Sequence, residues 1–412
     1  MKFHNTVLEN GLQVIAELGE EARSVAAGFF VKAGSRDEAP EVAGVSHFLE
    51  HMVFKGTPNR DALAVNRDFD RVGAKHNAQT SEEDTLYHVT CLPEYLPRSF
   101  EVLSDILRPS LREDDFDTEK KVIIEEIRMY QDNPMSVAYD AAKALHFGPH
   151  PLGQSILGTV ESIEGMKVDR MRDYFAKKYS PSNIVLAVAG RTEWDQVVAL
   201  AKEHCGTWAG TDTDRQAVAP KGTFGFQAIL RDDDQQQTLI GVNDGPPLES
   251  DDRFAAQLLA TVLGDHTGSR LYWAFVDPGH ADGAELSYQE YNQAGAFFSF
   301  LSCSPEDARE NLGRLTEVYR EVMSKGVCAE ELVRAQNKVL SRSVLRSERP
   351  MGRLSSLGFQ WTYRREYMTV AEELDAYGKV TVADLRRILD RWPLLPMTVV
   401  SVGPTTDVKA VI

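Results

Sequence analysis

The feature that most constrains the fold is that the second half of the chain repeats the order of strands and helices found in the first. Residues 12–18 and 25–31 are short apolar segments bounded by Gly, Glu and Ser, and they predict a hairpin followed by a helix over 42–54. Residues 224–230 and 237–242 predict strands in the same way, again followed by a helix. We therefore expect two copies of one α+β plan, with weak sequence similarity between them.

Hydrophobic periodicity predicts the remaining elements. In the first half it predicts helices over residues 63–72, 94–107, 113–130 and 194–204, and strands over 85–91 and 183–189. In the second half it predicts helices over residues 254–263, 305–324 and 329–347, and a strand over 398–402. The irregular alternation of strands and helices favours an α+β fold over a regular series of βαβ units.

A polar stretch separates the two copies. Residues 208–222 are rich in Gly, Thr and Asp and lack hydrophobic periodicity, which is typical of a linker. We therefore predict a first domain over 1–207 and a second domain over 223–412. The length of 412 residues supports this division, because a single hydrophobic core stops growing at about 250–300 residues.

Composition excludes several classes of protein. The chain has 45 Lys and Arg residues against 62 Asp and Glu residues, so it lacks the basic surface of a general nucleic-acid binder. No apolar run approaches the roughly 18 residues that a transmembrane helix needs, and the N-terminal segment is too polar for a signal peptide. The 4 cysteines lie far apart, which predicts free thiols. We expect a cytoplasmic protein that binds neither nucleic acid nor membranes.

The sharpest local feature is the pattern H-x-x-E-H at residues 47–51. On a helix, residues four apart lie on one face, so His47 and His51 can direct two imidazole nitrogens at one point. Catalytic Zn²⁺ takes such nitrogens among three protein ligands and keeps one position for water. Glu50 lies near the same face and can take a proton from that water, whose pKa the metal lowers. Two histidines at this spacing also occur by chance, but this helix is apolar nearly all round and should be buried, so its polar groups need partners.

A third ligand is expected on the helix over 113–130, where Glu125 and Glu126 are adjacent. Glu125 has a basic residue four positions before it and another three positions after it, which indicates a solvent-facing salt-bridged side chain. Glu126 lies among apolar residues, so we expect it to point into the interior, where it binds either the metal or a buried cation. Glu119 lies two turns earlier on the same face and either orients a ligand by hydrogen bonding or is purely structural. The apolar residues around Glu126 are Val122, Ile123, Met129 and Tyr130.

The segment HFLEHMVFKGT at residues 47–57, followed later in the chain by Glu126, resembles the M16 metallopeptidases, the group of pitrilysin, insulinase and mitochondrial processing peptidase. The chain length is similar to that of the short bacterial branch, termed M16B. Segments that resemble the first domain of the family are LENGLQVIAE (8–17), GAKHNAQTSEEDTLYHV (73–89), FGPHPLGQSILGT (147–159) and YSPSNIVLAVAGR (179–191). The segment that resembles the long helical region of its second domain is LVRAQNKVLSRSVLRSERPMGRLSSLG (332–358).

The resemblance implies two similar α+β domains, each an antiparallel sheet covered by helices, as in the LuxS/MPP-like metallohydrolase fold. It implies that two subunits enclose a chamber in which peptides are cut. It further implies one Zn²⁺ per chain, held in the first domain by His47, His51 and Glu126, with Glu50 as the general base. The second domain is expected to hold no metal.

The resemblance also places Asn77 and Ala78 on an edge strand beside the metal, where an extended peptide can add as a further strand. On this view Asn77 contacts the backbone of the substrate, and the alternative is an ordinary turn asparagine. His76 and His88 are nearby and are interpreted as structural or surface residues.

The chain departs from the family pattern in its second domain. Active members of this branch usually carry the stretch R-E-K-R-G-L-A-Y after S-R-L, and its first Arg and its Tyr help to hold the substrate. Here the S-R-L at residues 269–271 is followed by no Lys or Arg before Arg309, and no other side chain reproduces an arginine fork. Read without gaps, the Arg and Tyr positions are occupied by Val276 and Gly283, and the tyrosines that could replace the lost Tyr are Tyr288 and Tyr291.

These residues together predict a zinc endopeptidase that cleaves peptides or short unfolded segments. It would act as a homodimer, or as a heterodimer with a related M16 subunit that supplies the Arg and Tyr pair. The competing hypothesis is a non-catalytic assembly subunit, against which the intact His47, Glu50, His51 and Glu126 argue. A peptide-binding partner subunit would instead lose these four residues and keep the Arg and Tyr pair.

Overall fold

The computed structural model describes residues 1–210, 215 and 218–408, and the chain divides into two compact units. Each unit combines segments from both halves of the sequence. The first contains residues 1–127, 155–216 and 345–368, and the second contains residues 128–154, 217–344 and 369–412. The domain boundaries at 207 and 223 stay a prediction, and part of the predicted linker over 208–222 lies outside the described residues.

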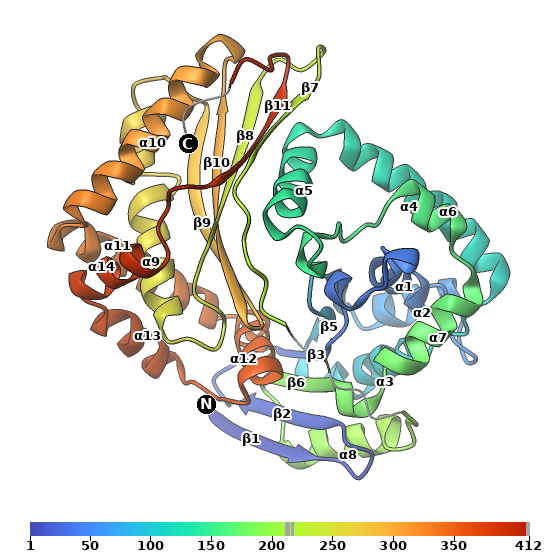
Figure 1. The fold of residues 1–412 in the computed structure, drawn as a ribbon. Helices are drawn as coiled ribbons and strands as arrows, with labels where there is room; N and C mark the ends of the chain where they lie inside the picture. The colour runs from blue at the N-terminus through green and yellow to red at the C-terminus, as the bar shows by residue number, and fades with distance from the viewer. Residues whose placement is uncertain (211–214, 216–217, 409–412) are drawn as a thin grey trace. The chain divides into compact units, whose positions relative to one another are not determined.

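The first unit is built on a six-stranded sheet with the order β1-β2-β6-β3-β5-β4 (Figure 1). β2 and β6 run parallel, and the other neighbouring strands run antiparallel. The strands are β1 (Lys2–Val7), β2 (Gln13–Leu18), β3 (Val25–Val31), β4 (Lys75–Thr80), β5 (Thr85–Cys91) and β6 (Ile184–Gly190).

The predicted hairpin of residues 12–18 and 25–31 is wrong, because β6 lies between β2 and β3. β3 and β6 are buried along their whole length, since helices cover both faces of the sheet. This burial explains their uninterrupted apolar sequences. A strand that is buried on both faces carries no alternation, and its sequence does not indicate which strand lies beside it.

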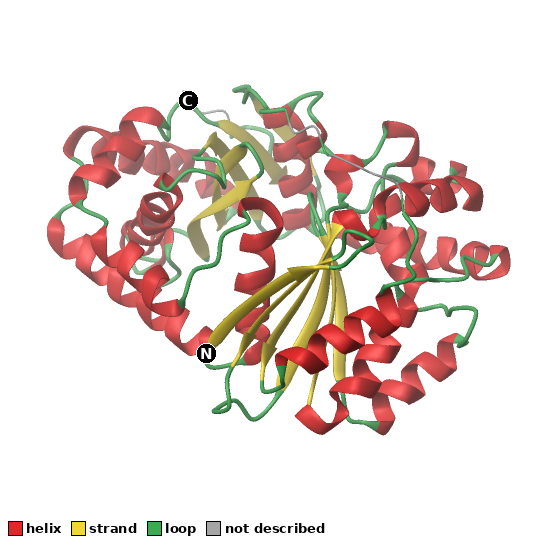
Figure 2. Cartoon of the chain, turned by 90° about the horizontal axis from the view of Figure 1, so that it is seen from below, coloured by secondary structure: helices red, strands yellow, loops and turns green. Residues whose placement is uncertain are grey.

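Helices cover one face of this sheet and form the main hydrophobic core of the unit with it. Figure 2 shows the strands as a fan with helices on both sides. The helices that contribute to this core are α1 (Val45–Val53), α2 (Ala62–Arg71), α3 (Leu96–Ile106), α4 (Glu113–Asp132), α6 (Val160–Gly165), α7 (Val168–Lys178) and α8 (Trp194–Cys205). The short 3-10 helices of the unit are η1 (Ser35–Asp37), η2 (Pro40–Val42), η3 (Pro93–Tyr95) and η5 (Pro181–Asn183).

The opposite face is covered by α12 (Pro350–Arg364), which comes from the second half of the sequence. Leu354 and Leu357 pack there against the sheet, and a buried ion pair joins Arg353 to Glu17. Gly358 permits the close approach of the helix, because a Cβ at this position would lie 2.0 Å from the ring of Phe30.

The second unit is built on a five-stranded sheet with the order β7-β11-β8-β10-β9. β7 and β11 run parallel, and the other neighbours run antiparallel. The strands are β7 (Phe226–Leu230), β8 (Gln237–Asp244), β9 (Gly283–Tyr291), β10 (Ala294–Cys303) and β11 (Thr398–Gly403).

Helices again cover both faces of this second sheet. α5 (Pro134–Phe147), which comes from the first half of the sequence, packs on one face through Ala138, Ala142 and Phe147. The helices on the other face are α9 (Asp252–Gly264), α10 (Ala308–Lys325), α11 (Ala329–Ser347), α13 (Val370–Lys379) and α14 (Val382–Arg391). The short helices are η4 (Pro151–Gly153), the π-helical η6 (Tyr272–Val276) and η7 (Pro305–Asp307).

The predicted α+β class is confirmed for both units, since each is a sheet covered by helices. The sheets are not wholly antiparallel, because each contains one parallel pair of strands. The two units share one plan: several helices cover one face of the sheet, and a single helix from the other half of the chain covers the opposite face.

Candidate metal centre

Helix α1 carries two of the expected ligands and is fixed at its N-terminus. The chain enters the helix through Gly44, whose φ of 89° is unfavourable for other residues, and a Cβ there would lie 2.4 Å from the Leu157 carbonyl oxygen. The Glu38 carboxylate accepts hydrogen bonds from the backbone N–H groups of Gly44, at 2.6 Å, and Ser46, at 2.7 Å. These bonds satisfy donors that have no partner within the helix, so the first turn is held in place.

His47 and His51 lie one turn apart on α1, with ring centroids 4.8 Å apart. Glu126 reaches them from α4: its Oε2 lies 3.6 Å from His51 Nε2 and 3.9 Å from His47 Nε2. One ligand atom from each of the three residues lies within 4.8 Å of the other two, and no other such group of His, Cys, Asp or Glu occurs in the described part of the chain. The structure thus brings together three side chains that the sequence places on two separate helices.

The separations of 3.6 Å and 3.9 Å are closer to those of atoms that share a divalent cation than to the length of a direct hydrogen bond. Atoms that bind one tetrahedral Zn²⁺ at about 2.0–2.1 Å lie about 3.3 Å apart, whereas a direct N–H···O hydrogen bond is about 2.9 Å long. Burial and the neighbouring His51 lower the pKa of His47 to about 4, so its imidazole is neutral at pH 7, as a metal ligand must be. His47 Nδ1 is buried without a hydrogen-bond partner among the described residues. Two imidazole nitrogens and one carboxylate oxygen form a donor set that suits Zn²⁺.

Glu119 holds His51 from the side opposite Glu126. Its Oε1 lies 2.9 Å from His51 Nδ1, and its Oε2 lies 2.5 Å from Lys55 Nζ. Burial alone would lower the pKa of His51, but the hydrogen bond to Glu119 and the charges of Glu126 and Glu50 outweigh it and raise that pKa. Burial would raise the pKa of Glu119, but its bonds to His51 and Lys55 outweigh burial and lower it. A carboxylate on Nδ1 that leaves Nε2 for the metal is the usual support of a metal-binding histidine.

Glu50 lies on α1 next to His51 but outside the group of three converging side chains. Its Oε2 accepts a hydrogen bond from Thr80 Oγ1 at 2.6 Å. Burial raises the pKa of Glu50, and the bond from Thr80 and the nearby His51 oppose this only in part. A carboxyl group with a raised pKa can both accept and return a proton near neutral pH.

β4 carries Asn77 and Ala78 and is an edge strand of the first sheet. Asn77 is exposed and pairs with His88 on β5, while Ala78 is buried and pairs with Tyr87. No strand pairs with the other side of β4 within the described residues, so its backbone groups can receive an extended peptide. α1 packs against β4, and this edge therefore borders the helix that carries the histidines.

His76 and His88 lie in the same hairpin but do not join the three converging side chains. The ring of His76 stacks on Phe69 with centroids 4.1 Å apart. Burial lowers the pKa of both histidines. This packing supports their interpretation as structural residues.

The surroundings of Glu126 differ from those that the sequence predicted for it. The periodicity predicted a buried apolar stripe, but Val122 and Met129 are 47% and 62% exposed. α4 buries Ile123 and Ile127, so the predicted stripe is correct for Ile123 and wrong for Val122, Met129 and Tyr130. The Glu126 side chain is 23% exposed and lies at the margin of the buried face, from which it reaches α1. Apolar side chains are common on protein surfaces, and their periodicity alone therefore did not locate the buried face.

Thr80 and Lys55 contribute to the site, and the sequence analysis did not predict either. Residues two apart on a strand point to the same face, so the placement of Ala78 on an edge strand beside the metal could have indicated that Thr80 lies on the same face as Ala78. Lys55 lies beyond the last residue of α1, where helical periodicity gives no information about side-chain direction.

The tyrosines that could replace the lost substrate clamp are engaged within the second unit. The Tyr288 hydroxyl donates to the Pro246 carbonyl oxygen at 2.6 Å, and the Tyr291 hydroxyl donates to Gln289 Oε1 at 2.6 Å. Val276, at the expected Arg position, lies in the π-helical turn η6. Each tyrosine hydroxyl would therefore have to lose its present hydrogen bond before it could bind a peptide.

The fold and the converging side chains define the class of two-domain α+β metallopeptidases, and family models agree with this class. The model described as insulinase, peptidase family M16, matches residues 13–160, and the model described as peptidase M16 inactive domain matches residues 165–339. The chain belongs to peptidase family M16.

Its relatives include uncharacterized zinc proteases of several bacteria. The protein of Streptomyces coelicolor is 30% identical over 98% of this chain and 90% of its own length. The protein of Mycobacterium bovis is 30% identical over 93% of this chain and 89% of its own. YmxG of Bacillus subtilis is 29% identical over 92% of this chain and 94% of its own. These lengths are consistent with the short bacterial branch of the family.

Solved structures show the same fold. A protease from Helicobacter pylori superposes with a TM-score of 0.92 at 21% identity, over 98% of this chain and 99% of that chain. An M16-like peptidase from Alicyclobacillus acidocaldarius gives a TM-score of 0.86 at 22% identity, over 98% of each chain. None of the helices in the described part of the chain has the length and hydropathy to cross a bilayer.

Proposed function

We propose that this chain is a zinc-dependent endopeptidase that cleaves peptides or short unfolded segments. The observation that carries the proposal is the convergence of His47, His51 and Glu126, whose ligand atoms lie within 4.8 Å of one another. Membership of family M16 supports it, as do relatives that are named zinc proteases.

His47, His51 and Glu126 would hold one Zn²⁺, as in zinc sites with two histidines and one glutamate. Zinc, when bound, supplies Lewis-acid chemistry that polarises a carbonyl group and makes water more acidic. Glu119 keeps His51 Nε2 turned toward Glu126 through its bond to Nδ1. Lys55 in turn fixes the second oxygen of Glu119.

Glu50 is the general base of the proposed reaction. It takes a proton from the attacking water and later gives it to the leaving amine. Both transfers are favoured by a carboxyl group whose pKa is raised toward the working pH, and burial raises the pKa of Glu50. The bond from Thr80 engages Oε2 and leaves Oε1 to carry the proton.

The substrate is proposed to add to the free edge of β4 as an extended strand. Main-chain hydrogen bonds to β4 would supply affinity with little dependence on sequence. Asn77 is exposed on this strand and can contact the peptide backbone, and the backbone of Ala78 next to it can pair with an added strand. Because α1 packs against β4, a peptide bound there lies beside the three converging side chains.

A chamber formed by two subunits completes the proposal. The chain has no Lys or Arg between Arg270 and Arg309, so it cannot supply the arginine of the family clamp from this region. A related M16 chain could supply the Arg and Tyr pair in a heterodimer. In a homodimer, the chain would have to grip its substrate differently.

Two substitutions test the catalytic assignment. Glu50→Gln should retain zinc and lose at least about 100-fold in turnover, because only the proton acceptor is removed. His51→Ala should lose the metal itself. The matched control is Glu125→Gln, an exposed neighbour on α4, which should change neither. Zinc content by mass spectrometry and cleavage of quenched fluorescent peptides measure both effects, and full activity of Glu50→Gln would show that the assigned base is wrong.

A non-catalytic M16-like assembly subunit is the second candidate, and the missing clamp residues favour it. The intact Glu50 and the three converging side chains oppose it. A zinc-loaded chain that cleaves no peptide, even together with a related subunit, would support this candidate over the peptidase.

A further inference from the structure

Glu50 is fixed through one of its two carboxylate oxygens. Thr80 Oγ1 donates to Glu50 Oε2 at 2.6 Å, and both side chains are half-buried. Glu50 Oε1 accepts no hydrogen bond from the described residues. A charge-assisted bond to one oxygen restricts rotation of the carboxylate and leaves the other oxygen in a defined direction.

Thr80 is the last residue of β4, the strand whose free edge is proposed to receive the peptide. It pairs with Thr85 across the hairpin, while Ala78 pairs with Tyr87. Since Thr80 and Ala78 lie two residues apart, they share the face of β4 that is turned toward the core. The threonine side chain has a branched Cβ and few allowed rotamers, so the position of β4 determines the position of the hydroxyl.

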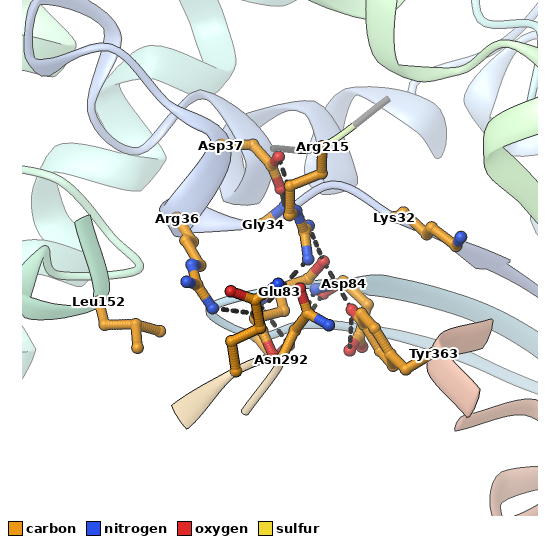
Figure 3. Close-up of polar contacts among 12 residues, drawn as sticks. Lys32, Gly34, Arg36, Asp37, Glu83, Asp84, Leu152, Arg215, Asn292 and Tyr363 are labelled. Carbon is orange, nitrogen blue, oxygen red and sulfur yellow. Dashed lines mark hydrogen bonds and ion pairs between the residues drawn. The ribbon is translucent and has the colours of Figure 1, made fainter. Parts of the chain in front are cut away.

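The turn that follows Thr80 is held by a dense set of hydrogen bonds (Figure 3). Ser81 Oγ accepts from the backbone N–H groups of Glu83 and Asp84, each at 3.1 Å. The Tyr363 hydroxyl, from α12, donates to the Glu83 carbonyl oxygen at 3.0 Å and to Asp84 Oδ2 at 3.2 Å. Arg215 also donates to the Glu83 carbonyl oxygen.

Buried ion pairs connect this turn to η1, which precedes α1 in the chain. Arg36 Nη1 lies 2.7 Å from Glu83 Oε1, with both side chains almost fully buried. Arg215 Nε donates to Asp37 Oδ1 at 3.0 Å, and Lys178 Nζ lies 2.9 Å from the same oxygen. Contacts from η1, α12 and Arg215 therefore hold the turn that follows Thr80, and Lys178 of α7 holds Asp37 of η1 in place.

We infer that Thr80 is a positioning residue that aligns Glu50 for proton transfer and links that alignment to the strand on which the peptide binds. The inference deepens the proposed function and rests on it. Because Thr80 belongs to β4, the direction of the Glu50 carboxylate depends on the position of that strand. Thr80 makes no hydrogen bond to His47, His51 or Glu126 within the described residues, so its effect should fall on turnover and leave metal binding intact.

The test compares two substitutions of nearly the same size. Thr80→Val keeps the shape and removes the hydroxyl, whereas Thr80→Ser keeps the hydroxyl and removes a methyl group. Thr90→Val, on β5 of the same hairpin, is the matched control, because the Thr90 hydroxyl makes no hydrogen bond within the described residues. Each full-length variant is loaded with zinc and assayed for kcat and KM on a quenched fluorescent peptide that the wild-type chain cleaves, and its zinc content is measured.

Thr80→Val should lower kcat by about tenfold or more with little change in KM, since a small misplacement of a catalytic group is costly. Thr80→Ser should restore most of the activity, and Thr90→Val should match the wild type, all with equal zinc content. Equal kcat for the valine and serine variants would overturn the inference alone. A wild-type chain that cleaves nothing with zinc bound, even together with a related M16 subunit that carries the Arg and Tyr pair, would overturn the proposed function together with it.

A second measurement examines the contact without catalysis. In the metal-free protein, Thr80→Val should lower the Tm by at least about 1 °C, because the hydrogen bond to Glu50 is lost. In a Glu50→Ala background the same substitution should have no such effect. Equal shifts in both backgrounds would show that the two side chains are not coupled, which would contradict the inference.

Discussion

At the residue scale, burial and neighbouring groups together decide how the buried acids of the first unit are charged. Glu119 has a lowered pKa, because bonds to His51 and Lys55 outweigh its burial. Asp84 is fully buried beside another carboxylate, and burial together with the charge of Glu83 raises its pKa to about 7. The first acid is therefore charged in the folded protein at neutral pH, whereas the second holds a proton up to about pH 7.

The raised pKa of Asp84 predicts a pH-dependent stability of the first unit. The ordinary value is 3.8, so the folded chain holds this proton more tightly than the unfolded chain does. The contribution is fully present below about pH 4 and is lost as pH rises toward about 7, for a total of about 4 kcal/mol. Asp84→Asn removes the titrating group, and its stability relative to the wild type should therefore increase from pH 4 to pH 8.

Denaturant unfolding of the metal-free protein at several pH values measures this difference. Asp169→Asn, an exposed position on α7, is the control for replacing an aspartate by an asparagine. A constant difference between Asp84→Asn and the wild type across this pH range would contradict the assignment.

At the element scale, periodicity predicted the bounds of individual helices and strands better than it predicted which strands lie side by side in the sheets. The strand over 85–91 matches β5 in full, and the helix over 113–130 ends two residues before the end of α4 at Asp132. The insertion of β6 between β2 and β3 was missed, because strands buried on both faces lack alternation. β4 was placed on a strand only by the family resemblance, since its polar sequence has a single buried residue.

In the candidate site too, a pattern of residues close together in the sequence was easier to predict than a contact between residues far apart in it. His47, Glu50 and His51 follow from one local pattern on one helix, and their arrangement needs only helical geometry. Glu126 was selected from its helix, although three of the four apolar residues used to orient it are exposed. Thr80 was missed because its contact joins residues that are 30 positions apart, and no local period encodes such a contact.

The close packing of α12 on the first sheet predicts a glycine requirement. Gly358→Ala should destabilise the first unit by about 1–3 kcal/mol, because the added Cβ would overlap the ring of Phe30. Gly165→Ala, at the end of α6 with no neighbouring atom within 4 Å, is the control and should change stability by less than about 0.5 kcal/mol. Chemical denaturation of the two variants gives the comparison, and equal stabilities would show that α12 does not approach the sheet this closely.

At the scale of the whole molecule, each half of the sequence supplies a helix that the other half needs. α12 covers a face of the first sheet, and α5 covers a face of the second. A fragment that ends at residue 207 would therefore expose Ile15, Phe30 and other apolar residues of that face. The two halves of the sequence follow the same order of elements, but each sheet needs a helix from the other half to cover one of its faces.

The missing clamp predicts that the purified chain needs a second kind of subunit. Alone it should bind zinc but cleave peptides slowly, because the region after Arg270 supplies no arginine. Addition of a related M16 chain that carries the Arg and Tyr pair and lacks H-x-x-E-H should raise kcat/KM, and native mass spectrometry should show a mixed dimer. A fully active homodimer of this chain would contradict the prediction.

The most direct test of the account is to locate the metal by anomalous X-ray diffraction at the zinc edge from crystals of the zinc-loaded protein. The account predicts one anomalous peak per chain, about 2.0–2.2 Å from His47 Nε2, His51 Nε2 and a carboxylate oxygen of Glu126. A zinc-loaded crystal in which Glu126 turns away from the two imidazoles, or in which the peak lies at other side chains, would contradict it.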